Sequence, residues 1–275
     1  MTKSLQQLEN DLADLEKQVL QFSPTFFQKY QQYLDILSQL TRKELILVSY
    51  QVCTEIHPSR FLEISVNQRG QIQEKIRNYA NSIENRLKTA MDFFSNESGH
   101  SSEDGELKIN EYLVNAKKPQ ELLMWSNNVE HTIDQIFNHY SDLLNRYFIE
   151  TKILPDNIPS KILELVSDSQ NEGPNFNGYT SLVQLVITAD ETATENKDFK
   201  ISNVVVIYLN RVKLELANPV LERAHRQIRS HYEQLKAQTQ TYKKNEQELI
   251  IAKSQSAWRA LWYDQVNPSQ NPPAS

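Results

Sequence analysis

The sequence predicts a mostly α-helical protein, an irregular bundle of about six to nine helices with long antiparallel, coiled-coil-like members. Glycine is rare, with 5 in 275 residues, whereas Gln, Asn, Glu and Lys are abundant. Such a composition favours helices with broad solvated faces over tight-turned sheets. Apolar residues also recur at heptad spacing near both ends of the chain. The chain is long enough to bury a core in one large or two small domains.

Residues 3–22 carry the most regular heptads. Their apolar positions alternate between spacings of three and four, and the opposite face is polar. A helix of three heptads is marginal alone, so we expect it to pack on another helix or on another subunit. The apolar positions are Leu5, Leu8, Leu12, Leu15, Val19 and Phe22.

The next helix is expected to begin at Ser23-Pro24, which is typical of an N-cap followed by proline at the first helical position. Residues 41–44 have capping-box spacing and mark either a new start or a bend in one helix. The helix is expected to end at His57-Pro58, because proline disfavours helix in the residue before it. Residues 61–64 then form a connector that we expect to pack into the core.

Ser65 and Gln68 have the spacing of a capping box, which predicts a helix running to about Phe94. Residues 1–94 are therefore interpreted as an N-terminal helical segment. Residues 95–105 are polar and acidic and contain glycine, which predicts a flexible loop.

Residues 106–264 are interpreted as a C-terminal helical segment that packs with the N-terminal helices as one bundle. Within this segment, Pro119 begins a long helix of about 30 residues with an apolar stripe. Residues 265–275 are rich in Pro, Asn and Ser and are predicted to be a disordered tail.

Residues 182–189 and 203–209 have two interpretations. Both are rich in β-branched residues, so they would pair as a short β-hairpin. Against this, apolar residues keep helical spacing through the second stretch and into the segment that follows, which favours helix. These residues are Val205, Leu209, Val212 and Leu216. We predict helix and keep the hairpin as the alternative.

The last long segment, from Ser202 to about Asp264, has an apolar residue at every seventh position. The column three residues further on is small or polar, so this face is half of a seam and needs a partner surface. Pro219 is expected to divide the segment into two helices. We predict that residues 3–22 supply the partner surface. The heptad column is Ile207, Leu214, Leu221, Ile228, Leu235, Tyr242 and Leu249.

No catalytic motif is recognisable, so we predict a protein that is not an enzyme and has no cofactor and no metal site. The chain lacks Gly-x-Ser-x-Gly and the glycine-rich loops that bind phosphate. The single cysteine, Cys53, lies in an apolar run and is expected to be buried and inert. Glu222 and His225 have the spacing of half a di-iron motif, but the second half is missing, which indicates a chance match. Two histidine–aspartate pairs are expected at the surface, His131 with Asp134 and His139 with Asp142.

Three features predict an interaction role instead, and together they supply the candidate interaction residues. The first is the N-terminal leucine seam, the second a basic face on the C-terminal helix, and the third an aromatic cluster just before the tail. The respective residues are Leu5, Leu8, Leu12 and Leu15; Arg223, Arg226, Arg229 and Lys236; and Trp258, Leu261, Trp262 and Tyr263.

The function expected first is a non-enzymatic helical scaffold or adaptor that acts through contacts with a protein partner, including a second copy in a dimer. One alternative is peripheral association with an anionic membrane through the basic, tryptophan-containing helix, and another is a helical-bundle enzyme or ligand carrier. The net charge of −6 argues against a nucleic-acid partner. A single cysteine and the absence of a signal-peptide core indicate a cytoplasmic location, peripheral to a membrane under the first alternative.

Three stretches resemble a family of uncharacterised helical proteins from cyanobacteria. They are residues 47–54 (LVSYQVCT), 61–69 (FLEISVNQR) and 218–221 (NPVL). The resemblance implies a cytoplasmic or thylakoid-associated setting and brings no activity, cofactor or catalytic residue.

Overall fold

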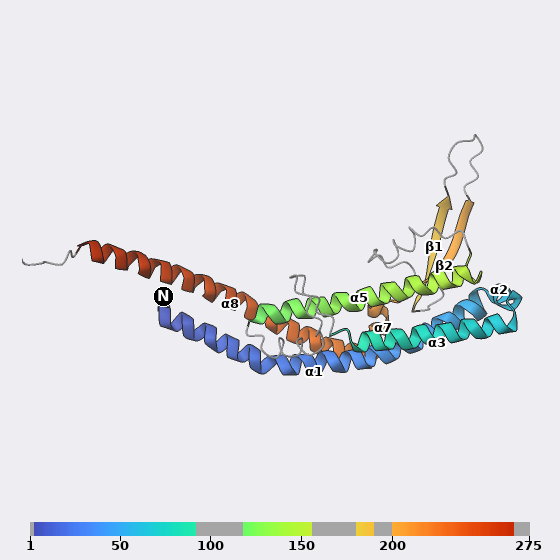
Figure 1. Cartoon of the computed structure of the whole chain (residues 1–275), viewed down its shortest axis with the longest axis horizontal. Coiled ribbons are helices and arrows are strands. Elements are labelled where there is room, and N and C mark those ends of the chain that lie inside the picture. The colour runs from blue at the N-terminus through green and yellow to red at the C-terminus, as the bar shows by residue number, and fades with distance from the viewer. Residues whose placement is uncertain (1–2, 92–117, 156–179, 190–199, 267–275) are drawn as a thin grey trace, which may run out of the picture. The chain divides into compact units, whose positions relative to one another are not determined.

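The structure, a computed structural model, describes residues 3–91, 118–155, 180–189 and 200–266 (Figure 1). Within these ranges it confirms a mostly α-helical fold with six α-helices, one π-helical turn and one two-stranded antiparallel sheet. The predicted loop at 95–105 lies outside the described residues. So does the predicted tail from residue 267 onward, whereas residues 265 and 266 finish the last helix.

The chain divides into two compact units, each assembled from stretches that lie far apart in the sequence. Unit 1 comprises Met1–Gln28, Asn96–Asn127 and Ile228–Ser275, and unit 2 comprises Lys29–Ser95 and Asn128–Gln227. Three long helices supply residues to both units: α1 (Leu5–Gln51), α5 (Pro119–Glu150) and α8 (Pro219–Val266).

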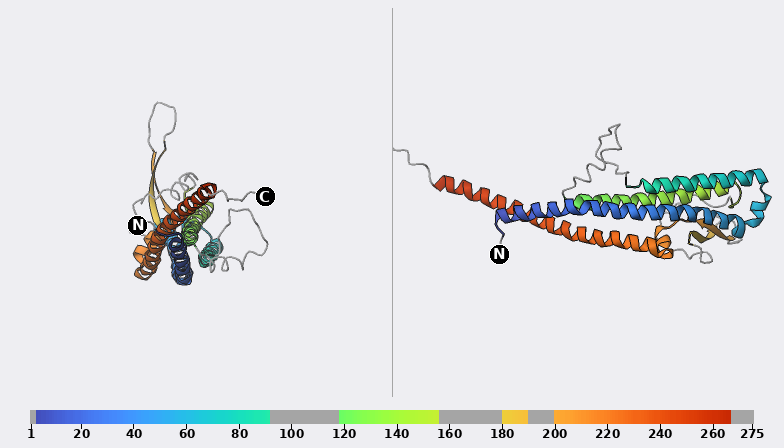
Figure 2. Two further views of the ribbon diagram at one scale, coloured as in Figure 1. Left: turned by 90° about the vertical axis from the view of Figure 1, so that its left-hand side faces the viewer. Right: turned by 90° about the horizontal axis from the view of Figure 1, so that it is seen from below.

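In unit 1 the first turns of α1 lie antiparallel to α8, which confirms the predicted packing of the two ends of the chain (Figures 1 and 2). Glu9 Oε1 lies 2.9 Å from Lys253 Nζ, and Glu16 Oε1 accepts a hydrogen bond of 3.0 Å from the Tyr242 hydroxyl. Apolar side chains are buried on both helices, among them Leu8, Val19 and Leu235. At the start of α5, Trp125 packs edge-on against Phe26 and Phe27.

The predicted break at Ser23-Pro24 is wrong, because α1 runs unbroken from Leu5 to Gln51. Proline has no N–H to donate to the carbonyl four residues back, which here belongs to Leu20. The Ser23 hydroxyl donates to that carbonyl instead, at 3.3 Å, and so the acceptor keeps a partner. The capping-box spacing at residues 41–44 marks no new start either. Thr41 donates its hydroxyl to the Leu37 carbonyl within the same helix.

In unit 2, α1 ends in a π-helical turn, η1 (Val52–Ile56), followed by α2 (Pro58–Glu63) and α3 (Val66–Lys88). The predicted end at His57-Pro58 and the capping box of Ser65 and Gln68 are confirmed. The prediction for residues 61–64 is wrong, since they are helical as far as Glu63 and Leu62 is 65% exposed. Helix α3 also ends earlier than predicted, at Lys88.

Residues 182–189 and 200–207 form the two strands of the hairpin, so the prediction of helix is wrong. Strand β1 (Leu182–Ala189) pairs antiparallel with β2 (Lys200–Ile207), and Leu182 lies opposite Ile207. Tertiary hydrogen bonds from α5 decide between the two structures. The Asn145 amide donates to the Ile207 carbonyl at 2.8 Å and accepts from the Ile207 N–H at 2.9 Å. The carboxamide therefore bonds both the N–H and the C=O of the last residue of β2, as a neighbouring strand would.

The predicted division at Pro219 is confirmed, because a short helix, α7 (Arg211–Ala217), precedes α8. Asn218 caps α8, and its Oδ1 accepts from the backbone N–H groups of Val220 and Leu221. The first member of the heptad column, Ile207, lies in β2 rather than in a helix. From Leu214 to Tyr242 the other members of the column are buried: Leu214, Leu221, Ile228, Leu235 and Tyr242.

Candidate functional site

The N-terminal leucine seam faces the interior of unit 1. Leu8 is buried, and Leu5, Leu12 and Leu15 are half-buried. The hydrogen bond between Glu16 and Tyr242 and the ion pair between Glu9 and Lys253 hold this part of α1 against α8. The seam is therefore covered by packing within the chain, although the sequence was also compatible with packing against another subunit.

The predicted basic residues of α8 all face solvent. Arg223, Arg226, Arg229 and Lys236 are exposed, and Arg226 pairs with Glu222 one turn before it. Helix α8 carries eight lysines and arginines against five acidic residues, although the whole chain has a net charge of −6. The helix therefore presents a positive surface on an otherwise acidic protein.

Residues 253–260, close to the end of α8, are exposed on all sides of the helix. Every residue in the range 253–260 is exposed, and Figure 1 shows the helix continuing beyond the start of α1. Ile250 (60% exposed), Ile251 (48%) and Trp258 (68%) place apolar side chains on this end. Ile251 and Trp258 are seven residues apart and share a face. Leu261, Trp262 and Tyr263 lie in the last turns of α8, but their side chains are outside the described part of the chain.

A cluster of charged and aromatic side chains joins four helices in unit 2. His225 on α8 contacts Glu215 on α7 at 2.8 Å, and the Tyr33 hydroxyl on α1 donates to the same carboxylate at 2.6 Å. On α5, Glu130 accepts a hydrogen bond from Arg211. The Arg211 Nε lies 3.3 Å from Asp134 Oδ1, an ion-pair contact outside hydrogen-bond geometry.

In this cluster, burial and the neighbouring charges shift the pKa values of the carboxyl groups in opposite directions. Burial alone would raise the pKa of Glu215, but hydrogen bonds from His225 and Tyr33, with the nearby positive charges, outweigh burial and lower it. Partial burial raises the pKa of the Asp134 carboxyl, although this side chain is 53% exposed and Arg211 acts in the other direction. Burial also raises the pKa of Tyr33 well above its usual value. The network consists of ion pairs and hydrogen bonds that connect α1, α5, α7 and α8.

The cluster does not form the metal site that the Glu222–His225 spacing would suggest. Glu222 bonds to Arg226, whereas His225 bonds to Glu215 on another helix. In the ranges that the structure describes, no group of three or more His, Cys, Asp or Glu side chains is arranged to hold a metal ion. On α5, Asp134 and Asp142 pair with arginines, and His131 contacts Gln135. Neither predicted histidine–aspartate pair forms.

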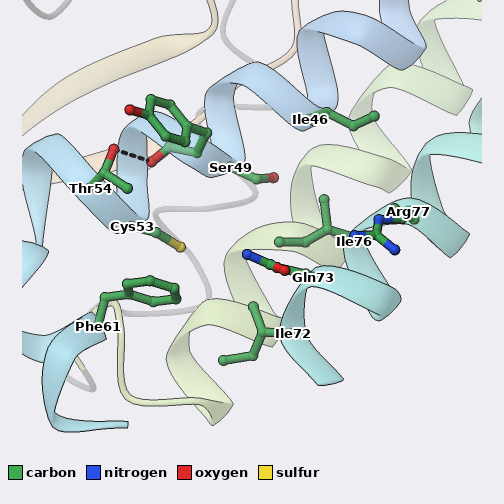
Figure 3. Close-up of a pocket in the computed structure, with 10 residues that line it drawn as sticks. Ile46, Ser49, Cys53, Thr54, Phe61, Ile72, Gln73, Ile76 and Arg77 are labelled. Carbon is green, nitrogen blue, oxygen red and sulfur yellow. Dashed lines mark hydrogen bonds between the residues drawn. The ribbon is translucent and has the colours of Figure 1, made fainter. Parts of the chain in front are cut away.

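An apolar pocket of about 330 Å³ lies elsewhere in unit 2, between the end of α1, η1, α2 and α3 (Figure 3). Cys53 is at this pocket, and burial raises the pKa of its thiol to about 12. The thiol is thus protonated at neutral pH, as the sequence predicted for a buried, inert cysteine. The full lining is Ile46, Ser49, Tyr50, Cys53, Thr54, Phe61, Ile72, Gln73, Ile76 and Arg77.

Sequence reasoning missed both the cluster and the pocket. Tyr33 and Glu215 are 182 positions apart, and neither belongs to a recognisable motif. The one available signal was that His225 lies four positions after the buried heptad residue Leu221, on the covered side of α8. The pocket had no signal, because its lining mixes buried and exposed residues from separate helices and none of them belongs to a recognisable motif.

No helix in the part of the chain that the structure describes combines the length and apolarity needed to cross a membrane. Comparisons with family models, with curated proteins and with solved structures find no match. The resemblance to helical proteins of cyanobacteria therefore stays a prediction.

Proposed function

We propose that this protein is a non-enzymatic helical scaffold or adaptor, and that it makes its protein–protein contacts through the end of α8. The observation that carries the proposal is the run of exposed residues at 253–260 beside the exposed apolar side chains of Ile250, Ile251 and Trp258. Most of the stability of a helix in a protein comes from packing of its apolar face, so a partner that covers these side chains would stabilise this part of α8. Exposed tryptophan beside aliphatic residues is also typical of interface hot spots.

A second copy of the chain is the first partner to test, because the apolar face of α8 would be self-complementary in a two-fold dimer. The test compares the wild-type chain with a double variant, Ile251→Asp with Trp258→Asp, by sedimentation over a hundredfold range of concentration. A wild-type protein that associates and a variant that stays monomeric support the proposal. The same pair, used as baits in affinity purification, reports on other protein partners.

A matched control is Ser256→Asp, which adds a carboxylate to the opposite face of the same exposed stretch. It should associate as the wild type does. The proposal fails if the wild-type chain is monomeric throughout and both baits capture the same proteins.

A second candidate function is peripheral binding to an anionic membrane. The observation that favours it is the exposed set of cations on α8, where Trp258 lies further along the same helix. Basic residues near an anionic surface each contribute roughly 1 kcal/mol. The double variant Arg229→Gln with Lys236→Gln should thus lose about 2 kcal/mol of binding in co-sedimentation with anionic vesicles. Equal, negligible binding to anionic and neutral vesicles would exclude this function.

We place either activity in the cytoplasm. The chain has a single cysteine, which is buried, and this suits a reducing compartment.

A further inference from the structure

We propose that the pocket between α1, η1, α2 and α3 binds a small amphipathic carboxylic acid, with its apolar body inside and its carboxylate at Arg77. The pocket measures about 330 Å³. An engineered apolar cavity of about 150 Å³ takes up benzene, which has six carbons. By that scale this pocket has room for roughly twelve non-hydrogen atoms, the size of a straight-chain acid of about ten carbons.

The interior of the pocket matches an apolar body. Figure 3 shows Cys53 and Phe61 on one side, facing Ile72 and Ile76 of α3. Ser49 and Thr54 also line it, but each hydroxyl is already donated to the backbone carbonyl four residues earlier, at 2.7 Å and 2.8 Å. These two residues therefore offer no donor to a ligand, and their remaining capacity is as acceptors.

Apart from the Tyr50 hydroxyl on α1, the nitrogen and oxygen donors that remain for a ligand lie on α3. Gln73 and Arg77 are one turn apart and both are exposed. Within the described residues Arg77 has no ion pair, whereas Arg42, Arg146 and Arg211 each pair with a carboxylate. An apolar interior with a cation and an amide at its rim is complementary to an acid, since guanidinium binds carboxylate through charge-assisted hydrogen bonds.

The wall of the pocket contains the π-helical turn η1, which supplies Cys53 and Thr54. Single π-helical turns are rare in proteins as a whole, but those that occur are often found at functional sites. The wider turn displaces the side chains that follow it. The pocket thus lies where the backbone of α1 departs from regular helix, and not at a random gap between regular helices.

The experiment uses the full chain and three ligands of equal length: decanoate, decanol and decylamine, all below their micelle concentrations. Isothermal titration calorimetry measures affinity, and hydrogen exchange of the backbone amides in residues 49–54 and 72–77, which line the pocket, locates the bound ligand. Decanoate should bind about tenfold more tightly than decanol and more tightly still than decylamine. It should also slow hydrogen exchange in these two stretches at saturation.

Two arginine variants on α3 locate the carboxylate. Arg77→Gln should reduce the affinity for decanoate about tenfold, to that for decanol, and leave the affinity for decanol unchanged. Arg86→Gln, an exposed arginine on the same helix outside the pocket, should bind decanoate as the wild type does. Both positions are at the surface, so both variants should fold.

Three results would overturn the proposal. One is the absence of decanoate binding at millimolar concentration. Another is binding without slower hydrogen exchange in residues 49–54 and 72–77, which places the ligand elsewhere. The third is an equal loss of affinity in the Arg77 and Arg86 variants, which reduces the effect to general surface charge.

Discussion

Arg211 on α7 is the cation that lies between two carboxylates of α5 in the cluster of unit 2. Its side chain is 14% exposed and faces Glu130 and Asp134 on α5, and Glu130 also accepts the Tyr30 hydroxyl at 2.9 Å. Buried ion pairs add little stability when they are compared with well-packed apolar residues, but breaking one leaves a charge uncompensated. The cluster is thus best tested by removing one member.

Replacing Arg211 with methionine should lower the free energy of unfolding by about 3 kcal/mol, because Glu130 would lose its cation in a partly buried site. The measurement is urea denaturation followed by circular dichroism. Arg226→Met is the matched control, since Arg226 pairs with Glu222 at the surface and exposed pairs contribute about 0.5 kcal/mol or less. Equal effects of the two variants would show that the cluster has no special role.

Glu215 should make stability depend on pH in the acid range. Its pKa is lower in the folded protein than in the unfolded chain, so the unfolded chain binds a proton first as pH falls. Its contribution is therefore complete above about pH 4.3, the unfolded value, and is lost as pH falls through the folded pKa. The difference in unfolding free energy between wild type and Glu215→Gln should shrink between pH 5 and pH 3 (roughly one unit on either side of that value).

Asp134 should have the opposite effect on the pH dependence of stability. Its pKa is raised in the folded protein, so the folded protein binds the proton first and gains relative stability as pH falls. Asp134→Asn should thus steepen the acid loss of stability, whereas Glu215→Gln should flatten it. Identical pH profiles for the two variants would contradict the assignments.

At the scale of elements, prediction succeeded where the signal was local. The capping box of Ser65 and Gln68 and the break at Pro219 each depend on a few neighbouring residues, and both are present. Prediction of secondary structure failed where a residue far away in the sequence determines which structure forms. Val205 and Leu209 fit helical spacing as well as a strand, and the choice falls to Asn145, 62 positions before Ile207. The break at Pro24 failed because the Ser23 hydroxyl satisfies the freed carbonyl.

The hairpin should depend on Asn145. Removing its amide in Asn145→Ala leaves the N–H and C=O of buried Ile207 without these partners, which costs about 2–4 kcal/mol. The amide of Ile207 should also lose protection in hydrogen exchange. Gln135→Ala, at an exposed position of the same helix, should change stability by less than about 0.5 kcal/mol. Unchanged exchange at Ile207 in Asn145→Ala would show that β2 is held by other contacts.

At the scale of the whole molecule, each compact unit combines stretches that lie far apart in the sequence, and unit 1 contains residues from both ends of the chain. Unit 1 combines the first 28 residues with the range from Ile228 onward. The heptads at the two ends predicted this pairing, because each had an apolar face in need of cover. They could not predict the division into units, since α1, α5 and α8 pass from one unit to the other without a break in sequence pattern.

Deleting residues 1–22 should therefore destabilise α8 within unit 1. The deletion removes buried Leu8 and Val19 and uncovers the side of α8 that holds Leu235 and Tyr242. Hydrogen exchange should show faster exchange over residues 228–253, and the thermal midpoint should fall. In the full-length chain, Leu8→Asp should act in the same direction, because it places an unpaired charge in an apolar site. Ala13→Asp, the same change at an exposed position of α1, should leave exchange in α8 unaltered. If the shortened chain instead melts and exchanges as the full-length protein does, the N-terminal leucine seam does not stabilise α8 and is free to bind a partner.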